Sequence, residues 1–142
     1  MKTFEDLKKV LTLNYREDDI KIVIRAFHFA SEAHKGQKRR TGEDYIYHSI
    51  ATAYNLAKMK MDIPSIAAGL LHDVPEDTDF TFEDLKNNFG KEIYYLVKGV
   101  TKLGTLKYRG LERYAENLRK MFLAMAKDIR VIIVKLADRM HN

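Results

Sequence analysis

The segment LLHDVPEDT, residues 70–78, places one histidine and three acids within six residues, directly after the apolar run IAAG. Burying so many ionisable groups is costly unless they are paired or bind a metal. Imidazole and carboxylate together suit a divalent cation. On a helix, His72 would share a face with Glu76, and Asp73 with Asp77, because each pair is four residues apart. The segment therefore indicates a metal-binding or catalytic site.

Pro75 lies in the middle of this segment and cannot donate a helical hydrogen bond. We therefore expect a helix that begins before residue 70 to kink or end at Pro75. Such a bend would turn Glu76 and Asp77 away from the core and towards a cleft.

Two further residues interrupt apolar helical patterns and are candidate ligands. His48 lies in YIYHSIA, directly after a basic loop, and Asp138 follows the apolar run in IIVKLAD. Each also has a simpler interpretation. His48 could be a hydrogen-bonded core histidine, and Asp138 could be an exposed acid paired with Arg139 or Lys135. Taken singly, these two residues leave both interpretations open.

The elements that must position these residues follow helical periodicity almost throughout. The last segment, IRVIIV, is β-branched and would also suit a buried strand. Good helix formers follow it and no other segment offers a strand to pair with it, so we predict helix and an all-α fold. The predicted features are a helix capped by Thr3, helices over 18–34 and 45–60, a basic loop over 35–44, a helix opened by Pro64, a helix from a Thr81–Asp84 capping box to Gly90, a helix over 91–102, a flexible stretch over 103–110, and helices over 111–126 and after Asp128.

Length and composition narrow the class of protein. A chain of 142 residues is expected to form one domain. It has no long apolar segment, which predicts no membrane span. The lack of an apolar secretion signal at its start and the lack of cysteine agree with a cytoplasmic protein. The net charge of +5 favours an anionic partner, and composition leaves nucleic acid and a small polyphosphate both open.

Four ordered blocks of the sequence resemble a known family. They are HKGQKRRTGEDYIYH, GLLHDVPEDT, VTKLGTLKYRG and ENLRKMFLAMAKDIRVIIVKLADRMHN. Together they resemble the N-terminal HD-type hydrolase domain of the RelA/SpoT homologues, the bacterial enzymes of the alarmones guanosine tetra- and pentaphosphate. The resemblance implies a multi-helix HD-domain phosphohydrolase bundle over residues 1–142, truncated at its C-terminal end, within a whole protein that carries synthetase and regulatory domains.

The resemblance also implies an activity and a set of site residues. The activity is metal-dependent hydrolysis of the 3′-diphosphate, which gives GDP or GTP and pyrophosphate, with no direct binding of nucleic acid by this portion. The family more often has an aliphatic residue where this chain has Pro75. The implied residues are His48, His72, Asp73 and Asp138 as ligands of one manganese ion, Glu76 and Asp77 as the acidic catalytic pair, Arg39, Arg40 and Thr41 as a nucleotide-binding loop, and Asn142 as a substrate contact.

In this reading Glu76 would orient or deprotonate a metal-activated water, with Asp77 in support. Lys38, Arg39 and Arg40 would neutralise phosphate charge, whereas Lys107 and Arg109 are better interpreted as solvated cations. Two alternatives remain. One is an HD phosphohydrolase of another nucleotide. The other is a non-catalytic nucleic-acid-binding module, which the lack of aromatic residues within the basic run argues against.

Overall fold

Helices form nearly all the regular structure over residues 1–104 and 128–141, which are the residues described by the computed structural model. The predicted all-α class is therefore confirmed. The predicted helix over 111–126 and most of the stretch over 103–110 lie outside the described residues. The helices are α1 (Phe4–Asn14), α2 (Glu17–Ala33), α3 (Ile46–Lys58), α4 (Ile63–Leu71), α5 (Val74–Asp77), α6 (Phe82–Phe89), α7 (Lys91–Gly104) and α9 (Ile129–His141).

Local sequence signals set several of the helix ends. Thr3 and Asp6 form a capping box at the start of α1, and Thr81 and Asp84 form another at the start of α6. Each box satisfies backbone N–H groups that have no partner within the helix. Gly90 ends α6 with φ of 91°, a conformation that glycine adopts without steric cost. The predicted capping box and stop are both confirmed.

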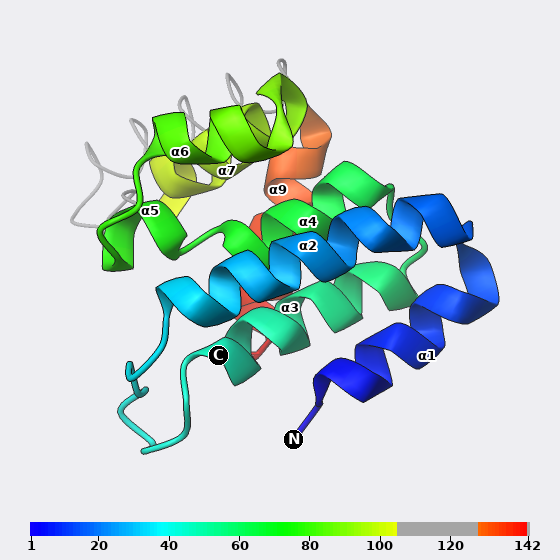
Figure 1. Cartoon of the computed structure of the whole chain (residues 1–142), viewed down its shortest axis with the longest axis horizontal. Coiled ribbons are helices and arrows are strands. Elements are labelled where there is room, and N and C mark those ends of the chain that lie inside the picture. The colour runs from blue at the N-terminus through cyan, green and yellow to red at the C-terminus, as the bar shows by residue number, and fades with distance from the viewer. Residues whose placement is uncertain (105–127, 142) are drawn as a thin grey trace, which may run out of the picture.

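Helix α4 lies at the centre of the bundle, in contact with α2, α3, α7 and α9 (Figure 1). All but one of its nine residues are buried, which is expected of a helix that is apolar on every face. Its N-terminus is capped by Asp62, with Pro64 in the first turn as predicted. A Cβ added at Gly69 would lie 2.7 Å from Leu56 Cδ1, so glycine permits the close approach of α4 to α3. Just beyond the end of α4, His72 lies near His48 at the start of α3, with ring centroids 5.6 Å apart.

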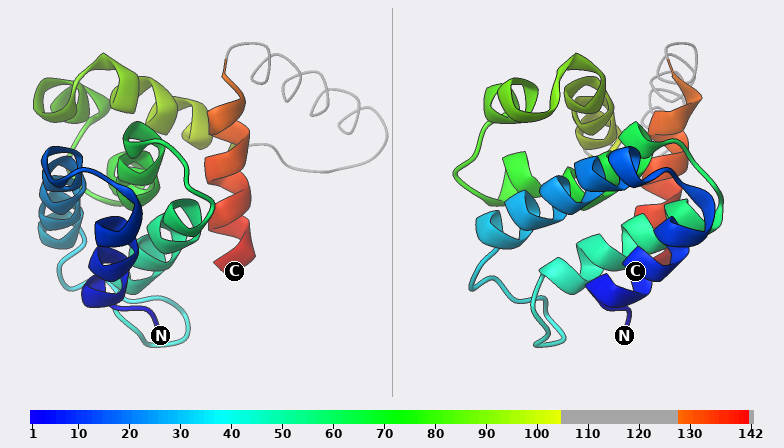
Figure 2. Two further views of the ribbon diagram at one scale, coloured as in Figure 1. Left: turned by 90° about the vertical axis from the view of Figure 1, so that its right-hand side faces the viewer. Right: turned by 45° about the vertical axis from the view of Figure 1, so that its right-hand side comes forward.

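Helix α9 contains the segment whose sequence also suited a strand. It packs against α3, α4 and α7, and Figure 2 shows it beside the end of α7. A Cβ at Gly99 of α7 would lie 2.7 Å from Cγ2 of Val131, so these two helices also meet closely at a glycine. Helical packing on three neighbours therefore outweighs the β-branched preference of IRVIIV, and the helix prediction is confirmed.

Arg130 fixes the start of α9 to two other helices. Its guanidinium lies 2.6 Å from Asp128 and 2.7 Å from Glu92, and it also pairs with Asp62. Asp128 accepts a hydrogen bond from the backbone N–H of Arg130 at 2.9 Å, as the predicted cap requires. The N-terminal ends of α4, α7 and α9 are therefore joined through a single side chain.

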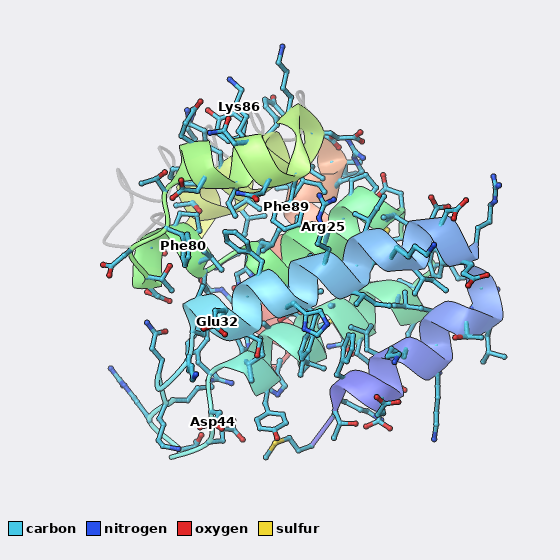
Figure 3. All side chains as sticks on the ribbon, viewed as in Figure 1. Arg25, Glu32, Asp44, Phe80, Lys86 and Phe89 are labelled. Atoms are coloured by element: carbon cyan, nitrogen blue, oxygen red, sulfur yellow. The ribbon has the colours of Figure 1, made fainter. Side chains whose placement is uncertain are left out.

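Aromatic side chains attach α6 to α2. The ring of Phe29 lies 4.8 Å from that of Phe80 and 5.4 Å from that of Phe89, and Arg25 lies over Phe89 at 5.0 Å. Figure 3 shows Arg25, Phe80 and Phe89 in the region between α2 and α6. Because α5 directly precedes this segment, the cluster also restrains the position of α5. No helix among the described residues is long and apolar enough to span a bilayer.

Candidate active site

The site begins with His48 on α3 and Asp138 on α9. Both side chains point into the bundle, with 2% and 8% of their surface exposed. His48 Nε2 lies 2.7 Å from Asp138 Oδ1. Asp138 is therefore a buried acid that reaches the predicted partner histidine, although Lys135 also pairs with it at 2.8 Å, as the simpler interpretation proposed.

His72 and Asp73 lie in a break between α4 and α5. The expected interruption of the helix is present, but it falls earlier than Pro75, because α4 ends at Leu71 and Pro75 lies in the first turn of α5. The physical reason is that a proline ring clashes with the carbonyl four residues earlier, which here is that of Leu71. The steric effect of Pro75 therefore falls before the HD pair. His72 and Glu76 do not share one continuous helical face.

The break directs His72 towards α9. His72 Nδ1 lies 2.6 Å from the carbonyl oxygen of Gly69, while Nε2 lies 2.9 Å from Asp73 Oδ2 and 3.2 Å from Asp138 Oδ1. One nitrogen or oxygen atom from each of the four residues can be chosen so that all lie within 4.8 Å of one another. The structure thus brings His48, His72, Asp73 and Asp138 together.

The hydrogen bonds of this cluster show that it fits a cation. A carbonyl can only accept, so His72 Nδ1 must carry a proton and donate it to Gly69. In a neutral ring the lone pair of Nε2 would then point at two carboxylates. Such an arrangement is repulsive unless a proton or a metal ion lies between them. A buried set of two imidazoles and two carboxylates suits a divalent cation of the first transition row.

The pKa shifts within the cluster also indicate a site that fits a cation. Burial opposes protonation of His72, but its hydrogen bonds to Asp138 and Asp73 prevail and raise its pKa to about 10. Burial likewise opposes ionisation of Asp138, yet its bonds to His48 and His72 hold its pKa well below the ordinary value. The cluster therefore stabilises two carboxylates and attracts positive charge.

Each of the four side chains has a second partner that restrains it, as is usual for metal ligands. Sequence reasoning proposed only Lys135 among them and missed Tyr45 and His141. Both lie three residues from a candidate ligand, a spacing that places them on the same helical face. The hydroxyl of Tyr45 donates to Asp73, and Lys135 pairs with Asp138. His141 contacts His48, and the carbonyl of Gly69 accepts from His72.

The acidic pair Glu76 and Asp77 lies on α5, at the surface beside the cluster. Partial burial and the neighbouring carboxylate of Asp73 raise the pKa of both groups. Gln37 in the basic loop donates a hydrogen bond to the carbonyl oxygen of Asp77, so the loop and α5 are held together. A raised pKa brings a carboxylate closer to the range in which it can exchange protons near neutral pH.

The basic loop faces the same site. Figure 1 shows it extending from one end of the bundle between α2 and α3. It contributes four residues to an open hollow of about 460 Å³, which lies within the range of small-molecule sites. Asn142, Lys107 and Arg109 lie outside the described residues. The hollow is lined by Lys38, Arg39, Arg40, Thr41, Tyr45, His48, Asp73 and Asp138.

Comparison with known proteins gives a consistent result. Residues 26–142 match the model of the HD domain family. The chain is 50% identical over 143 aligned positions to the bifunctional (p)ppGpp synthase/hydrolase SpoT of Escherichia coli K12, covering 100% of this chain and 20% of that protein. It is 48% identical over 138 positions to a guanosine-3′,5′-bis(diphosphate) 3′-pyrophosphohydrolase of Aquifex aeolicus, covering 97% of this chain and 19% of that protein.

A solved structure is similar as well. A metazoan orthologue of SpoT, described as hydrolysing ppGpp, aligns with a TM-score of 0.63 and 31% identity. The alignment covers 82% of this chain and 65% of that one. The chain spans about a fifth of the length of the curated relatives that it matches.

Proposed function

Because the chain belongs to the HD domain family, we propose that it is the hydrolase portion of a RelA/SpoT-type protein and removes the 3′-diphosphate of guanosine tetra- or pentaphosphate. The observation that carries this proposal is the buried His/Asp cluster opening onto a hollow lined by Lys38, Arg39 and Arg40. A whole protein with synthetase and regulatory segments, and a cytoplasmic location, belong to the same proposal.

His48, His72, Asp73 and Asp138 would hold one divalent cation, which we propose to be manganese. When bound, such a cation supplies a Lewis acid that lowers the pKa of a coordinated water and makes a nucleophile available near neutral pH. The carboxylates offer oxygen ligands and the imidazoles nitrogen ligands, a mixed set that suits manganese without excluding its neighbours in the series.

The acidic pair would manage the proton of the attacking water. Glu76 takes the proton at its carboxylate, and its raised pKa makes it a better base than an ordinary glutamate. Asp77, held through its backbone by Gln37, supports the same water by hydrogen bonding. The oxygen of the water forms a bond to the phosphorus attached to the ribose, the bond from that phosphorus to the 3′ oxygen breaks, and the 3′ oxygen gains a proton.

The basic loop would bind the charged groups of the substrate. Guanidinium groups pair with phosphate oxygens through two parallel hydrogen bonds and keep their charge at all relevant pH values. Arg39 and Arg40 would bind the diphosphate or stack on the base, and Thr41 would add a hydroxyl donor. The products are GDP or GTP and pyrophosphate.

The test is a nucleotide panel assayed with manganese, with magnesium and with a chelator. We expect guanosine tetraphosphate to yield pyrophosphate only when metal is present, and GTP and GDP to remain intact because they lack the 3′-diphosphate. Equal turnover of GTP would favour an HD phosphohydrolase of another nucleotide. Tight binding to generic RNA with a steep salt dependence and no hydrolysis would favour a nucleic-acid-binding module.

A matched pair of variants tests the role of the acidic pair. Glu76→Gln should lower the rate about 10²–10⁴-fold, the usual effect of losing a general base, while the metal content stays near that of the parent protein. Glu83→Gln removes an exposed carboxylate from the first turn of α6 and should leave the rate unchanged. Loss of metal in Glu76→Gln would show that Glu76 is a ligand or supports one.

A further inference from the structure

Helix α9 contacts both ring nitrogens of His48. Asp138 Oδ1 lies 2.7 Å from Nε2, and His141 Nδ1 lies 2.8 Å from Nδ1. The rings of His48 and His141 are stacked, with centroids 5.0 Å apart and planes inclined by 26°. Asp138 and His141 are three residues apart, so one face of α9 supplies both contacts.

The basic loop reaches the same atom. Arg39 Nη1 lies 3.2 Å from His141 Nδ1. A guanidinium can only donate hydrogen bonds, so His141 Nδ1 must be the acceptor. The nitrogen of His48 that contacts it must then be the donor. In a neutral His48 ring the lone pair is then on Nε2, 2.7 Å from Asp138 Oδ1, where a proton or a bound cation must lie between the two atoms.

Two donors therefore share one acceptor. An imidazole nitrogen has a single lone pair in the ring plane, whereas Arg39 and His48 both direct an N–H at it. Each bond is weaker than it would be alone. When Arg39 moves onto an anionic ligand, the whole lone pair becomes available to His48.

We propose that His141 is a positioning residue that sets the tautomer of His48 and couples the basic loop to the metal centre. The proposal rests on the metal centre and substrate loop of the proposed function. Binding of a phosphate group by Arg39 would strengthen the bond between His48 and His141 and so favour metal binding. By reciprocity, bound metal would favour release of Arg39 to the substrate.

The experiment is a double-mutant cycle on metal affinity, measured with manganese alone and no nucleotide. His141→Ala should weaken manganese binding about 10- to 100-fold, as loss of a partner of a ligand usually does. His141→Asn places an amide oxygen near the position of Nδ1, so it should restore most of the affinity. Melting temperatures of each variant show whether the fold is retained.

The second arm of the cycle is Arg39→Ala. In the parent protein it should tighten manganese binding at least about fivefold more than Arg40→Ala does, because Arg40 has the same charge and is exposed. In the His141→Ala background this excess should vanish. It should also vanish with His141→Asn, because an amide oxygen has two lone pairs and can accept both bonds.

Any of three results would overturn the proposal. The first is unchanged manganese affinity in a folded His141→Ala variant, and the second is the same effect of Arg39→Ala and Arg40→Ala in every background. The third is failure to restore affinity in His141→Asn when its melting temperature is that of the parent. The cycle is independent of turnover. If manganese affinities follow the cycle but the alarmone stays intact, only the proposed function is refuted. If the protein is active but the effects of the Arg39 and His141 substitutions on manganese affinity are additive, only the role of His141 is refuted.

Discussion

In the absence of a cation, the structure places a proton on His72. Nδ1 donates to the carbonyl of Gly69, and Nε2 lies between the carboxylates of Asp73 and Asp138. These contacts outweigh burial and raise the pKa of His72 to about 10, while both acids have lowered pKa values. A metal ion that binds at Nε2 must therefore displace this proton at neutral pH.

The size of the effect follows from the raised pKa. With one proton displaced, the apparent metal affinity should rise about tenfold per pH unit at every pH well below about 10, which corresponds to about 1.4 kcal/mol per unit. A histidine with the ordinary pKa of 6.5 would give an affinity that is nearly constant above about pH 7.5. The interval between pH 7.5 and 8.5 separates the two cases.

The assay is calorimetric titration of metal-free protein with manganese over this interval, under anaerobic conditions. Titrations in buffers of different ionisation enthalpy should show release of about one proton per metal bound. His28→Gln is the matched control, because His28 packs against Phe4 and Phe27 away from the cluster. It should leave the slope unchanged. A constant affinity from pH 7.5 to 8.5 with no proton release would refute the reasoning.

The same proton affects the stability of the metal-free protein. The folded-state pKa of His72 lies above its ordinary value of 6.5, so this group contributes its full stabilisation below pH 6.5. The contribution is lost as the pH rises through about 10. Urea unfolding of the metal-free protein should show this loss, and saturating manganese should remove it.

Three other predictions follow from contacts described above. Tyr45→Phe removes the hydroxyl that donates to Asp73 and should weaken metal binding about 10- to 100-fold. Tyr15→Phe loses a phenol hydrogen bond to a backbone carbonyl elsewhere and should leave metal binding unchanged. Equal metal affinities of the two variants would contradict this prediction. Gly99→Ala should destabilise the fold by about 1–3 kcal/mol in urea, because the new Cβ would lie 2.7 Å from Val131; an unchanged midpoint would show that the helices adjust freely. Finally, the pH–rate profile should fall on the acid side through a pKa above 4.5, the ordinary value for Glu76, and Glu76→Gln should lack that limb.

The sequence predicted best those features that short-range chemistry determines. Thr3 and Thr81 cap helices because an acid lies three residues later, and such a box acts within one turn. His48 and Asp138 stood out because a titratable group on an apolar face is costly without a partner. Their proximity across the bundle is confirmed, and their role as ligands stays a prediction.

The break before His72 shows why the rest was not predicted. The clash of Pro75 acts on Leu71, four residues earlier, so the helix ends before the HD pair. Tyr45 and His141 were missed for a different reason. Each is an ordinary residue in its own segment. His141 becomes part of the site because α9 packs against α3, and Tyr45 because it reaches Asp73 between α4 and α5. Contacts of this kind depend on packing between distant segments.

The positions of His48 and Asp138 have a consequence for the lifetime of the protein. The two residues are 90 positions apart in the chain, so a cation held by both would crosslink α3 to α9 and close a long loop. At a free concentration 100 times its dissociation constant, a ligand stabilises the folded state by about 2.7 kcal/mol. Detachment of α9, which exposes chain to proteases, would then be rarer by about the same factor of 100. Metal supply would thus set how often the folded chain opens to proteases, in addition to its role in the proposed hydrolysis.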